Sequence, residues 1–298
     1  MNTLKQIDKI ENKSILNSIR LRDKNNSNLK DFLAEYTFYF TNLKKEIFDI
    51  LGEDDNASPT VILSLEVNKE TAKHLKHKVN KQLQDKGIRN VNILRQINKP
   101  KISVQNYLDI LTAYLVNEYT MEVEADTIDT LSQELEQYEE EFVLVYSDQQ
   151  GKVSKADRDI AFIVATQSDD RNIYKKFEDN IGRLYRMVRA NGYLSFVNPK
   201  AINTLPAITN SFRNNINTNI ETFSSAVVNQ AHLNAMQRAK IGVYTFRAVM
   251  DNRTTEVCKS LNGKSFKVSQ AQVGINFPPL HFKCRSSVVG KNGVYLKR

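Results

Sequence analysis

The pattern that most limits the fold of this chain is an apolar stripe in its last third. Six apolar residues recur there at spacings of four, four, three, four and four positions: Phe212, Ile216, Ile220, Phe223, Val227 and Ala231. This period places all six side chains on one face of an α-helix, which must bury that face to be stable. We therefore predict a helix that ends near Gly242, a residue suited to a helix C-terminus. We expect its apolar face to pack within the chain, with docking on another protein as the alternative.

Helical periodicity also dominates the residues before this stripe. We predict helices, separated by polar loops, over residues 4–22, 29–51, 69–85, 103–138, 155–165 and 173–189. Residues 24–28 are expected to separate the first two. The long helix that Ser103 caps is expected to be interrupted near residues 120–126. Aromatic residues of the second helix are expected in the core and not on a base-stacking surface: Phe32, Tyr36, Phe38, Tyr39 and Phe40.

Three short segments break the helical pattern. Residues 60–67 are rich enough in β-branched side chains to predict a short strand, with a buried helical turn as the alternative. Residues 198–206 are polar, contain two prolines and predict a linker. Residues 148–151 read Asp-Gln-Gln-Gly and predict a boundary between an N-terminal part and the rest of the chain.

The composition agrees with a helix-rich protein. The chain has 298 residues, of which 26% are charged and only ten are Gly, unlike an α/β enzyme punctuated by glycines. No run approaches the roughly 18 to 20 apolar residues of a membrane span, and the first residues lack the pattern of a secretory signal. We expect synthesis and assembly in a cytoplasm, away from a membrane.

After Gly242 the helical periodicity of the sequence gives way to alternating residues. Alternating residues predict strands over 243–250, 264–268 and 285–289, and the Asn-Gly pair at 292–293 predicts a hairpin with a further arm at 294–297. The fold class is therefore mainly α with a small C-terminal α+β module and an elongated multi-helix N-terminal part. We divide the chain into a helical N-terminal part (1–150), a helical connector and linker (151–209), and a helix with a small β module (210–298).

Positive charge is concentrated in the same C-terminal region. Residues 240–298 hold eleven of the chain's 42 Lys and Arg but two of its 34 Asp and Glu, whereas residues 102–151 hold twelve acidic and no basic residues. The C-terminal region is expected to meet phosphate or an acidic protein face, whereas an acidic stretch of that length repels DNA and is expected to point away from it. An ordinary solvated surface is the alternative. The candidates for facing DNA are Lys259, Lys264, Lys267, Lys283, Lys291, Lys297 and Arg298.

Both cysteines of the chain, Cys258 and Cys284, fall in this module, and His281 lies three residues before the second. Thiolate and imidazole are preferred zinc donors, so the three residues could bind zinc with Asp251 or water as a fourth ligand. The alternatives are a disulfide between the cysteines and two buried thiols beside a hydrogen-bonded histidine. A catalytic Cys284 with His281 as its base is a further alternative.

Two other sets of polar residues admit a functional and a plain interpretation. Asp251 and Arg253 could form a nuclease or phosphate-binding pair, but a surface turn with an Asp–Arg salt bridge is the favoured interpretation. His74 and His77 lie on a Lys-rich helix and are expected to be solvated.

The ordered string of residues in the C-terminal module resembles the phage Mu F-type domain. Its signature residues here are Asp251, Arg253, Thr254, Cys258, Gly263, Pro278, Pro279, His281, Cys284 and Arg285. The resemblance covers residues 210–290 well and 150–210 loosely, and it does not reach the first 150 residues. Some family members carry additional cysteines where this chain has Thr255 and Ser286, and this departure weakens the zinc interpretation.

The resemblance implies a minor capsid, or head morphogenesis, protein of a tailed bacteriophage and not an enzyme. Proteins of this family are low-copy virion components associated with the portal vertex, and some leave the particle with the genome. The implied partners are the portal protein, other head proteins and packaged double-stranded DNA. The implied location is the head interior or portal vertex, after synthesis in a bacterial host cytoplasm. The alternative is a phage-encoded effector or enzyme, such as a toxin or nuclease, that carries the domain for packaging.

Overall fold

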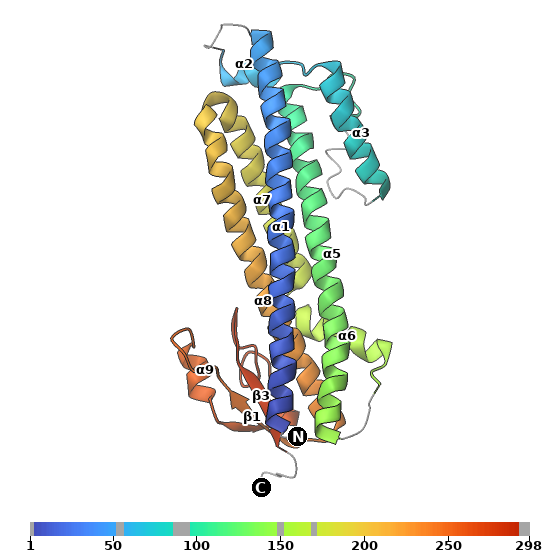
Figure 1. Ribbon diagram of the computed structural model, residues 1–298, viewed down its shortest axis with the longest axis vertical. Helices are drawn as coiled ribbons and strands as arrows, with labels where there is room; N and C mark the ends of the chain where they lie inside the picture. The colour runs from blue at the N-terminus through green and yellow to red at the C-terminus, as the bar shows by residue number, and fades with distance from the viewer. Residues whose placement is uncertain (1–2, 52–56, 86–95, 148–151, 168–171, 292–298) are drawn as a thin grey trace. The chain divides into compact units, whose positions relative to one another are not determined.

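Helices make up most of this protein. The computed structural model describes residues 3–51, 57–85, 96–147, 152–167 and 172–291. Its α-helices are α1 (Thr3–Leu51), α2 (Pro59–Ser64), α3 (Lys69–Asp85), α5 (Val104–Ser147), α6 (Lys155–Thr166), α7 (Ile173–Val197), α8 (Leu205–Arg238) and α9 (Glu256–Leu261) (Figure 1). The strands are β1 (Val243–Arg247), β2 (Ser265–Lys267) and β3 (Ser287–Lys291), and the 3-10 helices are η1 (Pro199–Thr204) and η2 (Val268–Gln270). The predicted class, mainly α with a small C-terminal α+β module, is confirmed.

The chain forms two compact units, each assembled from segments that are distant in sequence. The sheet unit comprises Met1–Asp23, Ala125–Lys176 and Ile216–Arg298. The helical unit comprises Lys24–Glu124 and Phe177–Asn215. The boundary expected at residues 148–151 lies outside the described residues, so the three-part division of the sequence stays a prediction.

Aromatic side chains of α1 form the centre of the helical unit. The Tyr36 ring lies 6.2 Å from the rings of both Phe32 and Phe40, measured between centroids. Phe40 then meets the ring of Phe196 from α7 edge-on at 5.2 Å. The buried members of the predicted aromatic set are Phe32, Tyr36, Tyr39 and Phe40. Phe38 is the exception, because 62% of it is exposed.

α1 is one continuous helix, so the break predicted at residues 24–28 is wrong (Figure 1). That run is polar but contains neither Gly nor Pro, the residues that end helices most strongly. Asn25 is buried and accepts hydrogen bonds from the Tyr119 hydroxyl of α5 through its side chain and its carbonyl. A buried partner therefore satisfies the hydrogen-bonding capacity of Asn25, whose polar sequence context alone predicts a loop.

α5 is also unbroken, and the interruption predicted near residues 120–126 is wrong. Tyr119 and Val123 are both buried, so this segment continues to pack against the core. Thr120 donates its hydroxyl to the Val116 carbonyl at 2.6 Å, which satisfies its polar group within the helix. The predicted cap is confirmed, because the Asn106 N–H donates to the Ser103 hydroxyl at 3.3 Å.

The two predicted non-helical connections are both helical. Residues 59–64 form α2, with Ser58 accepting from the Val61 N–H and Pro59 at the first position, so the predicted strand is wrong. The alternative is confirmed as a helix but not as a buried one, because Ile62 is the buried residue of α2. Residues 198–206 form η1 and the start of α8 instead of an open linker. Asn191 of α7 donates to the Ala201 carbonyl at 2.8 Å, which ties this connection to the preceding helix.

α8 buries the whole apolar stripe within the chain, as predicted, since each of its six members is at most 5% exposed. Its end differs from the expectation. Lys240, with φ of 54°, and not Gly242, takes the left-handed position that closes the helix. The Ile241 N–H donates to the Met236 carbonyl at 2.9 Å and the Lys240 N–H to the Gln237 carbonyl at 3.1 Å, the pattern of a Schellman cap.

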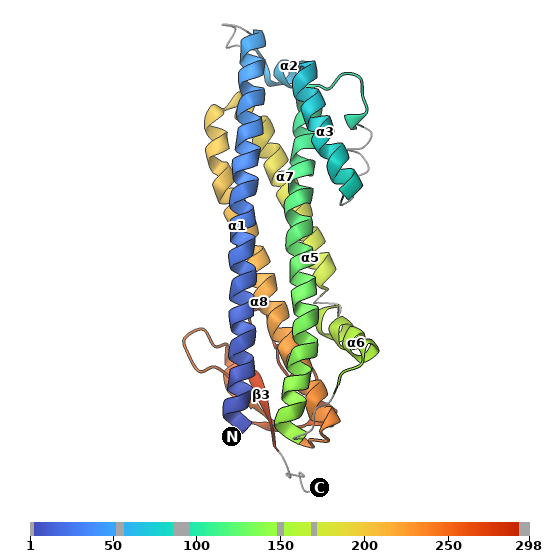
Figure 2. The ribbon, with the colours of Figure 1, turned by 45° about the vertical axis from the view of Figure 1, so that its right-hand side comes forward.

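In the sheet unit, the described strands form an antiparallel sheet in the order β2-β1-β3. Tyr244 of β1 pairs with Phe266 on one side and Gly290 on the other. The sheet lies beside the first turns of α1, where Arg247 of β1 forms an ion pair with Asp8 at 3.0 Å (Figures 1 and 2). The three predicted strands are confirmed with shifted ends, and the predicted hairpin arm at residues 294–297 lies outside the described residues.

Across the part of the chain that the structure describes, no helix has both the length and the apolar character needed to cross a membrane.

Candidate functional site

The predicted cluster of Cys258, His281 and Cys284 assembles against the face of the sheet. Phe246 of β1 is fully buried and packs in one apolar cluster with the two cysteines. Leu261 of α9 and Phe266 of β2 pack around the same cluster. Cys258 belongs to α9, whereas the other two residues lie on the loop that precedes β3. The sheet therefore provides the floor on which two separate segments meet.

A tight turn brings His281 and Cys284 together. The Cys284 N–H donates to the His281 carbonyl at 3.2 Å, and Lys283 between them has a left-handed φ of 57°. Two side chains of α8 form hydrogen bonds with the backbone of this loop. Thr222 accepts the Lys283 N–H at 3.1 Å, and Asn229 donates to the Ser286 carbonyl at 3.4 Å. The long buried helix thus fixes the loop that carries two members of the cluster.

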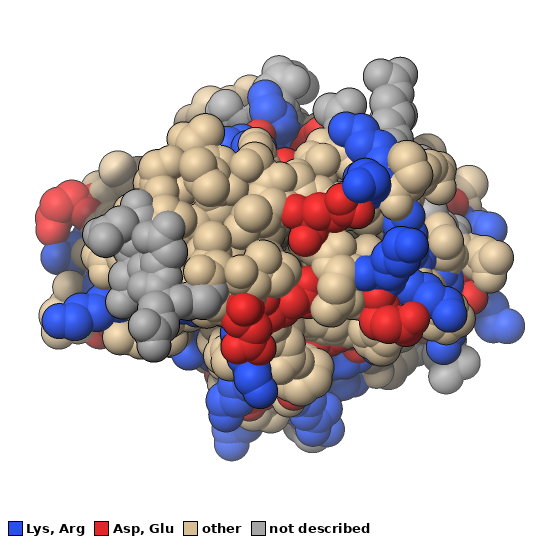
Figure 3. Space-filling view, turned by 90° about the horizontal axis from the view of Figure 1, so that it is seen from above, with Lys and Arg blue, Asp and Glu red and all other residues tan. Residues whose placement is uncertain are grey.

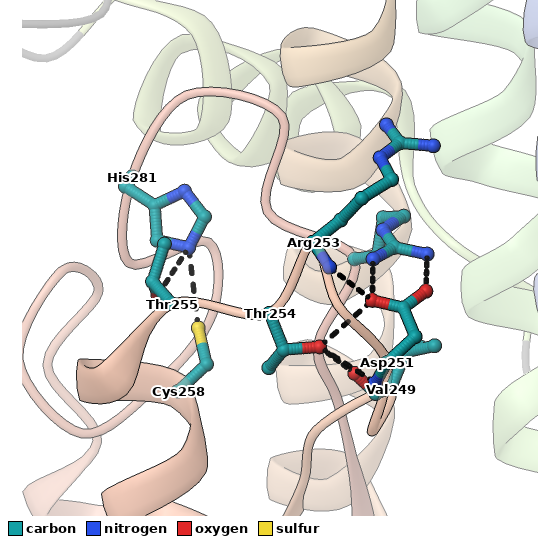
Figure 4. Close-up of polar contacts among 8 residues, drawn as sticks. Val249, Asp251, Arg253, Thr254, Thr255, Cys258 and His281 are labelled. Carbon is teal, nitrogen blue, oxygen red and sulfur yellow. Dashed lines mark hydrogen bonds and ion pairs between the residues drawn. The ribbon is translucent and has the colours of Figure 1, made fainter.

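The ligand atoms of the three residues lie close together, and Figure 4 shows the His281 ring directed at the Cys258 thiol. His281 Nε2 lies 3.2 Å from Cys258 Sγ, and the two sulfur atoms lie 3.8 Å apart. All three potential ligand atoms lie within 4.8 Å of one another. The Thr255 hydroxyl adds an oxygen 3.0 Å from His281 Nε2, and Figure 4 shows it on the same side of the ring as the thiol.

The hydrogen bonds of His281 define its tautomer. Nδ1 lies 2.8 Å from the Phe282 carbonyl oxygen, which can only accept, so Nδ1 carries the proton. In the neutral ring Nε2 then presents its lone pair to Cys258 and Thr255. A ring held through Nδ1 with a free Nε2 is the arrangement in which histidine acts as a base or as a metal ligand.

The two thiols differ in acidity. Burial raises the pKa of Cys258, but hydrogen bonds with Ser286, Thr255 and His281 outweigh burial and hold that pKa below its ordinary value. Burial raises the pKa of Cys284, which is therefore the weaker acid of the pair. Both cysteines are free in this structure, and their sulfur separation exceeds the roughly 2.0 Å of a disulfide bond. The thiol that the histidine contacts at 3.2 Å is Cys258, whereas the sequence had paired His281 with Cys284.

Asp251 lies outside the cluster and organises a neighbouring turn. Its two carboxylate oxygens accept from the Arg285 guanidinium at 2.6 and 2.7 Å. Oδ1 also accepts from the Arg253 N–H at 2.9 Å and from the Thr254 hydroxyl at 3.1 Å. The Arg285 pair dominates the electrostatics and holds the pKa of Asp251 well below its usual range. The favoured surface turn with an Asp–Arg salt bridge is present, with Arg285 and not Arg253 as the partner; Figure 4 shows the Arg253 side chain pointing away from the carboxylate.

The remaining signature residues shape the backbone around the cluster. Gly263 has φ of 78°, a left-handed conformation that favours glycine, and it directs the chain from α9 into β2. Its N–H donates to the Phe246 carbonyl at 2.9 Å, which joins that turn to the central strand. Pro278 and Pro279 are buried and lead into the loop that carries His281.

The basic candidates lie around the module with different partners. Lys264, Lys267 and Lys291 are exposed. Lys259 forms an ion pair with Glu256 at 2.7 Å, and Lys283 lies 3.9 Å from Glu221 of α8. Lys297 and Arg298 lie outside the described residues.

Several residues that support the site were not identified from the sequence. Thr222 and Asn229 belong to the polar side of α8, and nothing in their spacing indicates that they hold a loop some sixty residues later. The sequence likewise predicts no structural role for His232. It is fully buried, stacks on Phe142 with ring centroids 4.0 Å apart, and shares a hydrogen bond with Tyr146.

The fold and this cluster define a predominantly helical protein whose C-terminal α+β module carries a Cys-His-Cys cluster. Residues 197–289 match the family model described as phage Mu protein F like protein. The match confirms the resemblance that the signature residues indicate, and it covers η1, α8 and nearly the whole module. No curated protein and no solved structure matches the chain.

Proposed function

We propose that this chain is a minor head protein of a tailed bacteriophage and that it acts during head morphogenesis without catalysing a reaction. The observation that carries the proposal is the family match over residues 197–289. The matched segment coincides with a folded module in which Gly263, Pro279 and Arg285 each have a structural role. Signature residues that set the backbone conformation or form ion pairs are expected in a structural component of a particle.

We further propose that the module faces packaged DNA at the portal vertex. Its exposed lysines Lys264, Lys267 and Lys291 suit contacts with phosphate, which release counterions and do not read sequence. The face drawn in Figure 3 mixes Lys and Arg with Asp and Glu. Non-specific binding through one region lets a protein lie against densely packed DNA without a defined target.

The helical unit would then supply contacts with the portal protein and other head proteins. Its core is a continuous set of aromatic rings, such as Phe32, Tyr36 and Phe40, and this gives it the rigidity that a fixed position at a vertex requires. In this proposal the protein leaves the particle together with the genome.

Genetic complementation combined with a portal pull-down tests this proposal. Deleting the gene should yield misassembled or non-infectious heads, and supplying the full chain should restore them. The portal protein should retain the full chain from a lysate of infected cells, with an unrelated helical protein as the control. Normal infectious heads in the deletion, together with no retention by the portal protein, would exclude a role in head morphogenesis.

A further inference from the structure

The geometry of the three-residue cluster is close to that of a tetrahedral metal site. Zinc bonds of about 2.3 Å to sulfur place two thiolates about 3.8 Å apart, and bonds of about 2.0 Å to nitrogen place sulfur and imidazole about 3.5 Å apart. The observed separations are 3.8 Å between the sulfurs and 3.2 Å between Cys258 Sγ and His281 Nε2. A thiol–imidazole hydrogen bond and a sulfur–sulfur contact account for each distance singly; the feature that favours a metal is the convergence of all three donor atoms within 4.8 Å.

The residues around the cluster orient its donors. The Phe282 carbonyl holds the proton on His281 Nδ1, and this leaves Nε2 directed at Cys258 Sγ. The turn from His281 to Cys284 has two intervening residues, a spacing typical of paired zinc ligands on one loop. α8 anchors this turn through Thr222 and Asn229, so the loop donors are preorganised.

We propose that Cys258, His281 and Cys284 bind one zinc ion that ties α9 to the loop before β3. A fourth oxygen donor, from the Thr255 hydroxyl or from water, completes the site, because Asp251 is engaged by Arg285. Each thiol releases its proton on binding, and the histidine binds as the neutral ring. Two thiolates and an imidazole favour zinc over magnesium or calcium, which prefer oxygen ligands.

A structural ion gives this module a cross-link that its strands do not supply. β2 has three residues and β1 and β3 have five each, so the described sheet is small. Cys258 and Cys284 are 26 positions apart, and a shared ion closes that long segment onto the sheet. Because both cysteines are only 2% exposed, the ion is shielded on the side of Phe246 and accessible on the side of His281.

Cobalt substitution of the full chain tests the proposal directly. The protein is purified under reducing conditions, stripped of metal and titrated with Co²⁺. One equivalent should produce thiolate-to-cobalt charge-transfer absorption and the visible bands of tetrahedral cobalt, and Zn²⁺ should displace it. Elemental analysis should give one zinc per chain. Zinc should also raise the melting temperature, and a chelator should reverse that rise.

Variants separate the ligands from their neighbours. Cys258→Ser and Cys284→Ser should each weaken Co²⁺ binding by more than the roughly 10- to 100-fold that removal of an outer-shell partner costs. His281→Cys should retain binding with stronger charge-transfer absorption, which guards against a variant that merely fails to fold. Asp251→Asn and the exposed His77→Gln should leave binding unchanged.

Two results would overturn the proposal. The first is a folded, reduced chain whose thiols both stay reactive in saturating Zn²⁺ and which gives no cobalt charge-transfer band. The second is a disulfide between Cys258 and Cys284 that forms in air despite saturating zinc.

Discussion

Gly290 shows how closely individual residues of the sheet unit are packed. A Cβ atom at this position would lie 2.9 Å from Tyr146 Cε1 and 3.1 Å from Ile241 Cγ2. The Gly290 N–H also donates to the Tyr146 hydroxyl at 2.9 Å. β3 therefore approaches α5 at a point where only glycine fits.

Gly290→Ala should destabilise the protein by about 1–3 kcal/mol, the usual cost of overpacking a buried site. Urea unfolding followed by circular dichroism measures the change. Gly182→Ala is a matched control, because the new Cβ would meet only Arg186 Nη1, at 3.4 Å, within α7. The control should be neutral or stabilising by up to about 1 kcal/mol. Equal stability of Gly290→Ala and the unmodified protein would contradict the packing described at β3.

His232 should make the stability of the protein depend on pH. Burial, with a smaller contribution from Arg247, lowers its pKa from 6.5 to about 3. The folded state therefore binds fewer protons than the unfolded state between these values. Stability from this group is complete above pH 6.5 and falls as the pH decreases towards 3, by up to about 1.4 kcal/mol per unit.

The comparison that isolates this effect is with His232→Phe, which keeps the ring beside Phe142 but cannot be protonated. As the pH falls from about 6.5 to about 4, the unfolding free energy of the unmodified protein should decrease relative to that of His232→Phe. A difference that is constant over this range would show that His232 is accessible to protons in the folded state.

At the residue scale, the sequence was sufficient to select the cluster but not its contacts. Soft donors such as Cys258 and Cys284 stand out because the chain has no other cysteines. The predicted partner of Asp251 is wrong because Arg253 lies only two positions away in sequence, whereas the loop that carries Arg285 returns to the same turn 34 residues later. Contacts of this kind depend on the tertiary fold, which local spacing does not contain.

At the scale of elements, the end of α8 can be tested by substitution. Lys240 adopts a left-handed conformation that costs a non-glycine residue roughly 1 kcal/mol. Lys240→Gly should therefore stabilise the protein by up to about 1 kcal/mol, measured by thermal and urea unfolding. Lys240→Ala removes the same side chain without relieving the backbone and should not stabilise. A stabilisation by alanine equal to that by glycine would place the effect in the lysine side chain instead.

Helix identity was predicted more accurately than helix length. The helix and the buried face of α8 were predicted correctly because every residue of its periodic apolar stripe is buried. α1 and α5 were divided because Asn25 and the segment after Tyr119 look polar in sequence. In the structure these residues satisfy one another across two helices, since the Tyr119 hydroxyl donates to Asn25. A polar segment that forms a loop and a polar segment that makes a buried contact within a helix have the same local composition.

At the scale of the whole molecule, the compact units do not follow the order of the sequence. The sheet unit combines the first 23 residues with two later segments, because α1 begins beside the C-terminal sheet. The same packing joins the module to Asp8, a residue far outside the segment that the family model matches.

The proposed interaction with DNA predicts a measurable salt dependence. Lys264→Gln with Lys267→Gln removes two exposed charges of the module, and the slope of log Kobs against log salt should fall by about 0.9 for each lysine–phosphate pair that the substitutions abolish. Fluorescence anisotropy with a duplex of arbitrary sequence measures the slope. Lys69→Gln with Lys73→Gln, two exposed lysines of α3, should leave it unchanged. Equal slopes for the two double variants would contradict the proposal that the module is the DNA-facing region.

The most direct test of the central proposal is quantitative mass spectrometry of intact particles and of particles emptied of DNA. The proposed minor head protein should be present at low copy number in the intact particles and absent from the emptied ones. Retention in both would confirm a virion component and contradict ejection with the genome. Absence of the chain from intact, purified particles would contradict the assignment to the phage head altogether.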